Sequence, residues 1–311
     1  MPDPRLGRLA GLFDWAGLTI LDVGARGGPL PWVERLAPWS RYVACEPQAD
    51  AVVDAPAPTI WRERIVVREA LAAQEGPVTL NVTANGGFTS VLKPDQDLAQ
   101  AYCLVNEMAE VGTAQVPAIT LAQAAERYGF GELGFVKLDT QGSELDILRS
   151  GEALITGPVQ AIFIECEFRP FYQGQPLFAE IDIWLRERGF DLIALEPTSR
   201  RRRKPGSRVA YSKPEIAWAH ALYVKATPGE GEPDALKHII RQIAVAMAYD
   251  YFDLAADRLA EPRTQALLAA AGLAAGPEDV AAFVAAALGP EAEKQAVDVV
   301  RHRIPLQSRD H

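Results

Sequence analysis

The segment "VKLDTQGSELDIL" (136–148) places a lysine and three acids where a buried run gives way to a glycine turn. Lys137 and Asp139 are two residues apart, so in a strand their side chains share one face. Asp139 is the first candidate for a general base, and Lys137 could orient it or bind a substrate oxygen. Glu144 is the third candidate catalytic residue, although the dipole of a following helix would also favour an acid there.

A second acidic pair ends the next buried run, "VQAIFIECEF" (159–168). Glu165 and Glu167 again alternate onto one strand face, and the end of an adjacent strand would bring them close to Asp139. Three converging carboxylates repel one another unless they are protonated, paired or bound to metal. Because oxygen ligands suit Mg²⁺ and Mn²⁺, the sequence predicts a divalent metal site at Asp139, Glu165 and Glu167. Pairing of the glutamates with Arg169 or Lys137 is the alternative.

The stretch "LDVGARGG" (21–28) follows an apolar run with a glycine-rich turn. Its glycine spacing does not meet the dinucleotide fingerprint G-x-G-x-x-G, and no lysine follows to complete a phosphate loop. A turn of this kind suits a ligand that joins an amino acid to a nucleoside without phosphates, such as S-adenosylmethionine (SAM). Glycines would let the backbone approach that ligand closely.

An acid at the end of the second strand supports a nucleoside ligand. Nucleotide-binding α/β folds place such an acid about 20 residues after the glycine turn, where it binds the ribose hydroxyls. Glu46 in "VACEP" lies at this spacing. A solvated loop acid is the alternative interpretation of Glu46.

The elements that must position these residues alternate between short apolar runs and helix-like segments, which indicates a parallel sheet covered on both faces. The predicted strands are 18–24, 41–47, 64–70, 134–140, 159–168, 190–197 and 216–226. An elaboration at 76–130 is predicted to form a strand, a helix from Gln96 to about Val111, and a helix capped by Thr120. A basic loop is expected at 196–215.

Composition limits the classes of partner, the cellular location and the domain organisation that the sequence allows. The 311 residues carry a net charge of −10, which argues against a general attraction to nucleic acid or anionic lipid. We find no signal peptide and no apolar run long enough to span a membrane, and the scattered cysteines fit a reducing compartment, so a cytoplasmic location is expected. After a linker, the sequence pattern changes to helical, alanine-rich segments. This divides the chain into residues 1–228 and a C-terminal all-helical region, 229–311.

The motifs "LDVGARGG", "CEP", "VKLDTQGSELDIL" and "IECEF", in this order, resemble the FkbM family of SAM-dependent methyltransferases. The most specific part is K-x-D-x-x-G-x-E, which Lys137, Asp139, Gly142 and Glu144 match. The resemblance covers about residues 15–226. It implies a class I methyltransferase, Rossmann-like sheet with the strand order 3-2-1-4-5-7-6 and the last strand antiparallel, and O-methylation of sugars or of hydroxyls on small metabolites.

The same resemblance implies which residues bind the cofactor. Asp22, Gly24, Gly27 and Glu46 map onto the SAM motifs, and the loop "TANGGFTS", with Asn85, Thr89 and Ser90, is similar to a serine-bearing segment near the cofactor. A tight turn is the alternative for that loop. Arg26 could meet the SAM carboxylate or only cover the turn.

One departure from the family concerns histidine. Many members have E-x-H after the fifth strand, whereas this chain has Glu165-Cys166-Glu167. No histidine lies in the core motifs, so a histidine base is not indicated. His220 falls in the predicted last strand, where a core or surface role is expected.

Several alternatives stay open at the level of sequence. The acceptor is expected to be a sugar, a glycan or a small molecule, and the basic stretch Arg200–Lys204 could select an anionic one or only be solvated. The C-terminal helices could form a homo-oligomer, a lid or a docking module. A non-catalytic SAM-fold binding protein and an NAD(P)-dependent oxidoreductase are the competing classes.

Overall fold

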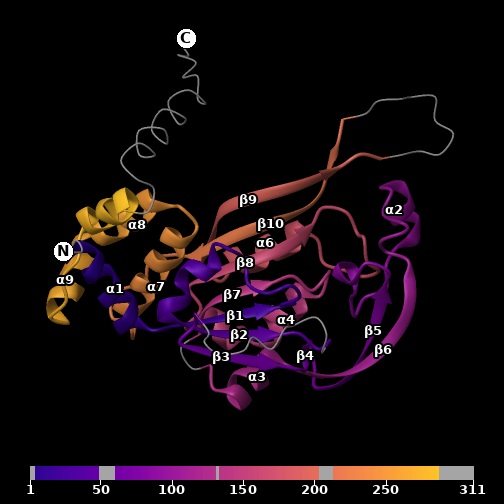
Figure 1. Cartoon of the computed structure of the whole chain (residues 1–311), viewed down its shortest axis with the longest axis horizontal. Coiled ribbons are helices and arrows are strands. Elements are labelled where there is room, and N and C mark those ends of the chain that lie inside the picture. The colour runs from indigo at the N-terminus through magenta and orange to yellow at the C-terminus, as the bar shows by residue number, and fades with distance from the viewer. Residues whose placement is uncertain (1–3, 49–59, 131–132, 203–212, 287–311) are drawn as a thin grey trace, which may run out of the picture. The chain divides into compact units, whose positions relative to one another are not determined.

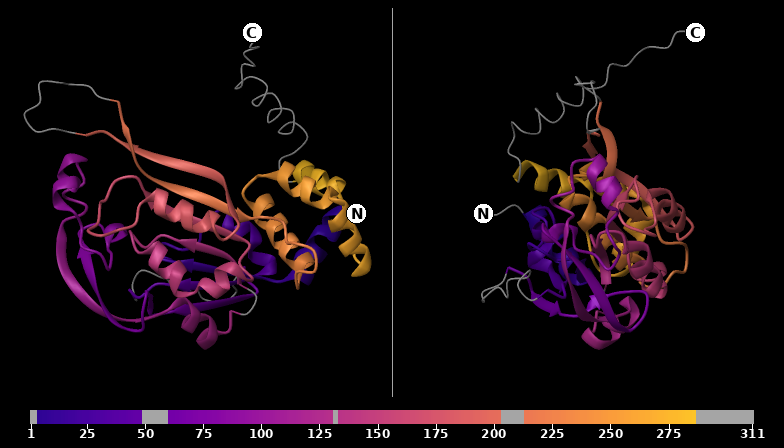
Figure 2. Two further views of the ribbon diagram at one scale, coloured as in Figure 1. Left: turned by 180° about the vertical axis from the view of Figure 1, so that it is seen from behind. Right: turned by 90° about the vertical axis from the view of Figure 1, so that its right-hand side faces the viewer.

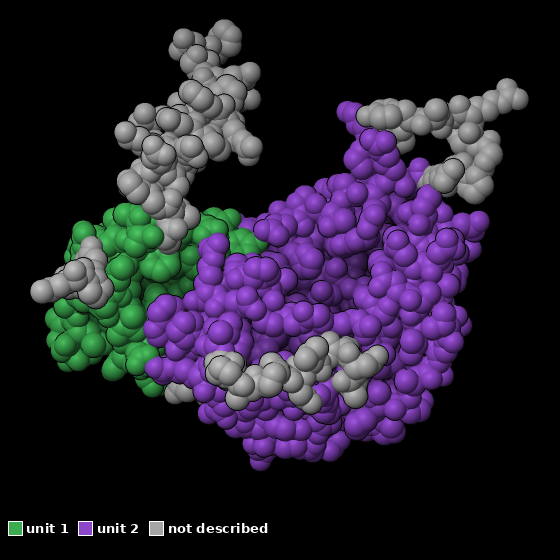
Figure 3. All heavy atoms as spheres, in the orientation of Figure 1, with its two compact units in different colours: residues 1–16, 233–311 green, residues 17–232 purple. Residues whose placement is uncertain are grey.

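The computed structural model describes residues 4–48, 60–130, 133–202 and 213–286. They belong to two compact units, Gly17–Glu232 and a smaller unit that combines residues 1–16 with 233–311 (Figure 3). The structure therefore groups the first helix with the C-terminal helices, whereas the sequence assigned it to the domain 1–228. The boundary between 228 and 229 itself stays a prediction.

The larger unit is built on a seven-stranded sheet with the spatial order β3-β2-β1-β7-β8-β10-β9 (Figure 1). The strands are β1 (Leu18–Val23), β2 (Ser40–Cys45), β3 (Glu63–Val67), β7 (Leu133–Leu138), β8 (Ala161–Glu167), β9 (Phe190–Arg200) and β10 (Glu215–Lys225). All neighbouring pairs from β3 to β8 are parallel, and β10 runs antiparallel to both β8 and β9. The predicted α/β fold with a mostly parallel sheet is confirmed.

The long strands β9 and β10 change the interpretation of the basic segment. They form a two-stranded ribbon that extends past the rest of the sheet (Figure 1, Figure 2). Glu215 pairs with Arg200, so residues 196–200 are strand and not loop. The backbone pairing with β10 decides this, because the segment itself has no apolar periodicity.

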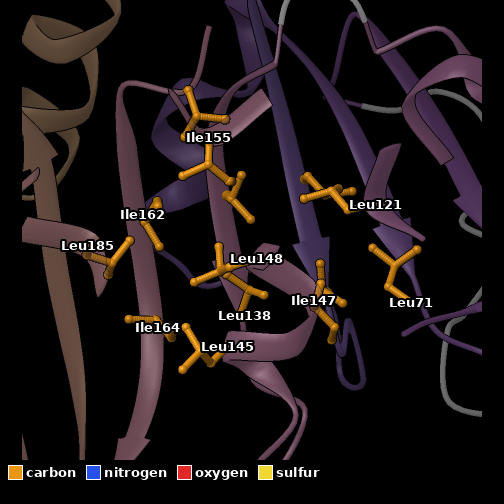
Figure 4. Close-up of a cluster of buried hydrophobic side chains, with 14 of the residues drawn as sticks. Leu71, Leu121, Leu138, Leu145, Ile147, Leu148, Ile155, Ile162, Ile164 and Leu185 are labelled. Atoms are coloured by element: carbon orange, nitrogen blue, oxygen red, sulfur yellow. The ribbon is translucent and has the colours of Figure 1, made fainter. Parts of the chain in front are cut away.

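Four helices cover one face of the sheet: α3 (Leu121–Tyr128), α4 (Glu144–Ser150), α5 (Glu152–Thr156) and α6 (Phe178–Arg186). Their apolar side chains meet those of β7 and β8 in a buried cluster (Figure 4). Leu21 and Val136 belong to this cluster. Because side chains alternate along a strand, their neighbours Asp22 and Lys137 point to the opposite face.

The opposite face has its own aromatic packing. Trp32, just before the 3₁₀ helix η1 (Val33–Trp39), packs edge-on against Phe135 and Phe163, with ring centroids 5.5 and 5.3 Å apart. Phe163 in turn stacks on His220 at 5.3 Å. The polar residues of this face therefore lie at the ends of the strands, above an aromatic layer.

The elaboration forms a second, three-stranded sheet in the order β4-β6-β5. Its elements are β4 (Ala70–Leu71), β5 (Gly76–Thr83), η2 (Gly86–Phe88), α2 (Gln96–Ala101) and β6 (Glu110–Ile119). The expected helix from Gln96 to Val111 is wrong beyond α2, since the chain turns back and Glu110–Ile119 pairs antiparallel with β5. Thr120 caps α3 as predicted, accepting a hydrogen bond from the Gln123 amide.

The smaller unit contains α1 (Pro4–Ala16), α7 (Ala235–Ala248), α8 (Phe252–Ala260) and α9 (Pro262–Ala270), and residues 277–286 are also helical. Arg241 of α7 donates a hydrogen bond to the carbonyl of Ala16, which ties α7 to the end of α1. The apolar face of α7, with Ile239, Ile243 and Met247, is buried. None of the helices in the described part of the chain is long and apolar enough to cross a membrane.

Gly24 occupies the tightest point of the larger unit. It follows β1 with a φ of +71°, and its N–H donates to the carbonyl of Cys45 at 3.0 Å. A Cβ built on Gly24 would lie 2.0 Å from the carbonyl oxygen of Asp139. The turn after β1 can therefore lie against the end of β7 only if the residue at this position has no side chain.

We expect Gly24→Ala to lower the free energy of unfolding by about 2–4 kcal/mol, because the left-handed conformation and the contact with Asp139 both oppose the methyl group. Gly27→Ala is the matched control. Gly27 also has positive φ, at +82°, but a Cβ added to it would meet nothing within 4 Å. It should lose only about 1–2 kcal/mol. Urea unfolding of both variants tests this, and equal losses would contradict the close contact.

Candidate active site

Lys137 binds the glycine turn through its side chain. Register places it directly beside Asp22, between β1 and β7. Its Nζ lies 3.1 Å from Asp22 Oδ1 and donates to the carbonyl oxygen of Gly24 at 2.8 Å. Tyr42 donates its hydroxyl hydrogen to the other oxygen of Asp22. Asp22 and Lys137 are thus engaged with each other in the buried layer under the turn.

Lys137 also favours its cationic form and lies close to Asp139. Burial lowers the pKa of Lys137, but the Asp22 and Asp139 carboxylates outweigh burial and raise it. Nζ lies 3.9 Å from Asp139 Oδ2. Lys137 therefore supplies positive charge beneath Asp139 from a fixed position.

A first cavity, of about 190 Å³, opens at the carboxyl ends of β1, β2 and β7. One part of its wall is apolar, with Ala70, Leu71 and Leu80, and another part is polar, with Glu46 and Arg26. We call it the nucleoside cavity, after the ligand that the sequence predicts for the glycine turn.

Glu46 and Arg26, two of the predicted cofactor-binding residues, both line the nucleoside cavity. Glu46 is buried, and one carboxylate oxygen accepts a hydrogen bond from the backbone N–H of Gln48 at 2.9 Å. Arg26 donates to the side-chain oxygen of Gln48 at 3.0 Å. A Cβ on Gly86 would lie 2.6 Å from the guanidinium carbon of Arg26, so Arg26 crosses from the glycine turn to η2.

The other residues expected at the cofactor differ in where they lie. Gly27 lies in the turn but not among the described residues that line the cavity. Ser90 lines the cavity, yet its hydroxyl donates to the backbone carbonyl of Gln141 at 2.8 Å and accepts from the N–H of Leu92 at 3.0 Å. Asn85 accepts from Gly87 N–H and so forms the tight turn that was the alternative for this loop.

The turn after β7 carries Gln141, which the sequence did not single out. Gln141 has a φ of +62°, a strained conformation for a residue with a side chain. Its amide donates to Asp139 Oδ1 at 2.9 Å and to Glu165 Oε2 at 2.5 Å, and its side-chain oxygen accepts from the Tyr172 hydroxyl at 2.9 Å. Gln141 therefore bridges the two acids and fixes their separation.

Glu144 holds the same turn from its other side. It is 1% exposed, and its carboxylate accepts from the N–H of Thr140 at 2.6 Å and from the N–H of Gly142 at 2.9 Å. Glu144 is not among the described residues that line the nucleoside cavity. In this structure the acid of the K-x-D-x-x-G-x-E pattern closes the turn, and a catalytic role for it stays a prediction.

A second cavity, of about 200 Å³, adjoins the first and shares Gly87, Asp139 and Gln141 with it. We call it the acidic–aromatic cavity. Its remaining lining residues are Phe88, Glu165, Glu167, Phe171, Tyr172 and Trp218. Phe88 comes from the elaboration, and Phe171 and Tyr172 follow β8, so the two sheets together enclose this space.

His220 joins the acids through strand register. In the antiparallel pairing of β10 with β8, His220 lies directly opposite Glu165. Its Nε2 lies 4.0 Å from Asp139 Oδ2. The sequence placed His220 in the last strand and expected a core or surface role; the structure confirms the strand and adds the proximity to Asp139, while its role stays a prediction. The one signal in the sequence was that it falls in the last strand, and only the register of β10 makes that informative.

The register also changes the candidate metal ligands. Within the described part of the chain, one atom each of Asp139, Glu165 and His220 lie within 4.8 Å of one another. Glu167, which the sequence grouped with Asp139 and Glu165, is not in this set. It lies one alternation further along β8, opposite Trp218.

The electrostatics divide the acids into two kinds. Burial raises the pKa of Asp139, but the neighbouring His220 and Lys137 outweigh burial and hold it well below its ordinary value. Burial, followed by the charge of Asp139, raises the pKa of Glu165 far above the ordinary range. Burial also raises the pKa of Glu167, with Glu144 and Asp139 adding to it. Asp139 is thus the preferred site of negative charge.

The basic stretch has partners within the chain where it is described. The guanidinium carbon of Arg200 lies 5.1 Å from the centre of the Trp218 ring. Arg202 lies 3.2 Å from a carboxylate oxygen of Glu215. Arg203 and Lys204 lie outside the described residues.

We expect Glu144→Gln to lower the free energy of unfolding by about 1–3 kcal/mol, because one amide oxygen replaces two carboxylate oxygens that accept buried N–H groups. The control is Glu152→Gln, whose side chain is 50% exposed and pairs with Arg188. Its loss should stay below about 1 kcal/mol. Urea unfolding measures both. An unchanged stability of Glu144→Gln with lost turnover would instead support the catalytic role.

Comparison with known proteins agrees with the fold. A family model, the methyltransferase FkbM domain, matches residues 22–192, which lie within the larger unit. Neither the curated proteins nor the solved structures contain a match to this chain. The family match spans the glycine turn, both cavities' acids and most of the parallel sheet, and it covers more than half of the 311 residues. The chain therefore belongs to the FkbM methyltransferase family.

Proposed function

We propose that this protein is a SAM-dependent O-methyltransferase that acts on a hydroxyl group of a sugar, glycan or small metabolite. The observation that carries the proposal is the position of Asp139, on the wall shared by the nucleoside cavity and the acidic–aromatic cavity. A methyl donor in the first cavity and a hydroxyl in the second would meet at this residue.

The nucleoside cavity has the chemistry that SAM requires. Glu46 can accept hydrogen bonds from the ribose hydroxyls, and Leu71 and Leu80 offer an apolar wall for the adenine ring. Arg26 is available at the turn for the carboxylate of the methionine part. The turn has no phosphate grip, and this argues against the NAD(P)-dependent alternative.

SAM supplies an electrophilic methyl group on a sulfonium ion. Transfer forms the bond from the acceptor oxygen to the methyl carbon and breaks the carbon–sulfur bond, whose electron pair stays on sulfur as a thioether. The hydroxyl proton must leave the acceptor oxygen. Asp139, oriented by Gln141, is the proposed base, and His220 Nε2 lies 4.0 Å from Asp139 Oδ2.

A divalent metal is a further part of the proposal. Asp139, Glu165 and His220 form a mixed carboxylate–imidazole set, which suits Mn²⁺ or Mg²⁺. Such an ion would supply Lewis-acid polarisation of the acceptor oxygen.

The residues around Asp139 argue against the non-catalytic alternative. Asp139 has Lys137, Gln141 and His220 around it at the junction of two cavities. An oligomer through the C-terminal helices and a cytoplasmic location stay predictions.

Two isosteric variants test the proposed division of roles. We expect Asp139→Asn to lower the rate of methyl transfer by about 10²–10⁴-fold, because the base is lost, while S-adenosylhomocysteine (SAH) still binds. We expect Glu46→Gln to weaken SAH binding about tenfold or more through the lost ribose contacts. Calorimetry with SAH and methyl transfer to a glycan panel give the two readouts. Loss of SAH binding in Asp139→Asn with unchanged binding in Glu46→Gln would contradict the assignment.

Metal dependence is tested separately. We expect Mn²⁺ or Mg²⁺ to bind the EDTA-treated protein with one-to-one stoichiometry, and His220→Ala to weaken that binding about tenfold or more because one ligand is removed. His238→Ala is the control, since His238 lies in α7 of the other unit. Calorimetric titration with each ion measures the binding. No heat of binding, with full activity after EDTA, would rule the metal out.

A further inference from the structure

We infer that the acidic–aromatic cavity selects an acceptor that carries an ammonium group beside the hydroxyl to be methylated, as in an amino sugar or an amino-cyclitol. This inference rests on the proposed methyl transfer and names the class of substrate for the same site. It differs from the expectation of an anionic acceptor.

The lining of the cavity is unbalanced in charge. Asp139, Glu165 and Glu167 all line it, and no lysine, arginine or histidine does so among the described residues. The nearest buried cation, Lys137, is already engaged with Asp22 and the Gly24 carbonyl. An anionic acceptor would therefore find no cation to pair with among these lining residues, whereas a cationic one would find carboxyl groups that can accept its hydrogen bonds.

Glu167 supplies an independent sign of a missing partner. It is 3% exposed, and its Oε2 is buried without a hydrogen-bond partner among the described residues. The Gln175 amide is close enough to lower the pKa of this carboxyl, but neither Gln175 Nε2 nor Glu167 Oε2 makes a hydrogen bond of good geometry. Buried polar groups normally have partners, so a carboxylate oxygen left open at a cavity wall calls for a donor from the ligand. An ammonium group is the strongest such donor.

Aromatic rings surround the same end of the cavity. Trp218 lies directly opposite Glu167 across the β8–β10 pair, and Phe171 packs edge-on against Trp218 with ring centroids 5.8 Å apart. Tryptophan faces attract cations, and the Trp218 ring already holds the Arg200 guanidinium at 5.1 Å. Aromatic faces also stack on the apolar faces of sugar rings. A carboxylate next to a tryptophan thus fits an ammonium carried on a ring.

The distance between Glu167 and Asp139 separates the proposed ammonium site from the proposed site of methyl transfer. Glu165 and Glu167 are two residues apart, about 7 Å along the strand. Glu165 is bridged to Asp139 by Gln141 at the reacting end, and Glu167 lies at the far end. An ammonium bound to Glu167 keeps its proton and has no lone pair to attack with. The hydroxyl at Asp139 is then the group that accepts the methyl.

The test is a matched set of acceptors at pH 7, assayed as SAH formation with the full-length protein. The set contains the methyl glycosides of the positional aminodeoxyglucose isomers, their N-acetyl counterparts, and the methyl glycosides of glucose and glucuronic acid. We expect kcat/KM for the best amine to exceed that of its N-acetyl counterpart by about tenfold or more, with the product methylated on oxygen.

Two variants locate the preference. Glu167→Gln should remove most of it by raising KM for the amine, with little change in kcat, whereas Glu187→Gln should leave it intact. Glu187 lies on the surface beside α6, and its side chain is 67% exposed. If Glu167→Gln does not fold, Trp218→Leu is tested in its place. It should raise KM for the amine by a larger factor than KM for the N-acetyl compound.

The outcomes distinguish this inference from the proposed function. The inference is overturned if SAH binds but no amine is methylated or bound better than its neutral counterpart, or if the glucuronide is preferred. It is also overturned if Glu167→Gln keeps the wild-type preference. Failure of SAH to bind, together with no transfer to any acceptor, would instead overturn the proposed methyltransferase activity.

Discussion

The buried contact of Lys137 with Asp22 and the Gly24 carbonyl is the interaction on which the rest of the site depends. It joins the ends of β1 and β7, so the glycine turn and the turn at Asp139 share one anchor. Removing one partner of such a pair would leave an uncompensated charge in the sheet, which is strongly unfavourable. The same cation lies beneath Asp139 and favours its ionised form. Structure and chemistry at this edge therefore have a common electrostatic origin.

The acids of the second cavity are arranged at a cost to stability. Glu165 and Glu167 are buried beside Asp139, and burial together with mutual repulsion raises the pKa of both. A fold under selection for stability alone would place apolar residues there. The strained Gln141 adds to the cost, because its amide must reach two carboxylates at once. Costs gathered at one point are typical of a functional site.

The two cavities share one wall but differ in the other segments that line them. The nucleoside cavity is formed mainly at the carboxyl ends of the parallel strands, where open α/β sheets bind their ligands. The acidic–aromatic cavity needs η2 for Phe88, the segment after β8 for Phe171, and β10 for Trp218. Ala70, Leu71, Leu80 and Ser90 of the elaboration also line the nucleoside cavity, so the elaboration contributes to both cavities.

The sequence by itself determined the α/β class, the buried strands and the acids at their ends, because strand periodicity and glycine turns are local patterns. It also indicated Glu46 and Asp139 as wall residues of a ligand site. Only the tertiary structure decided that His220 lies opposite Glu165, that Glu167 lies opposite Trp218 and that Glu110–Ile119 is a strand. Register between strands distant in the sequence leaves no local pattern, since it depends on which backbones pair and at what offset. The acidic–aromatic cavity is therefore the part that only the tertiary structure reveals.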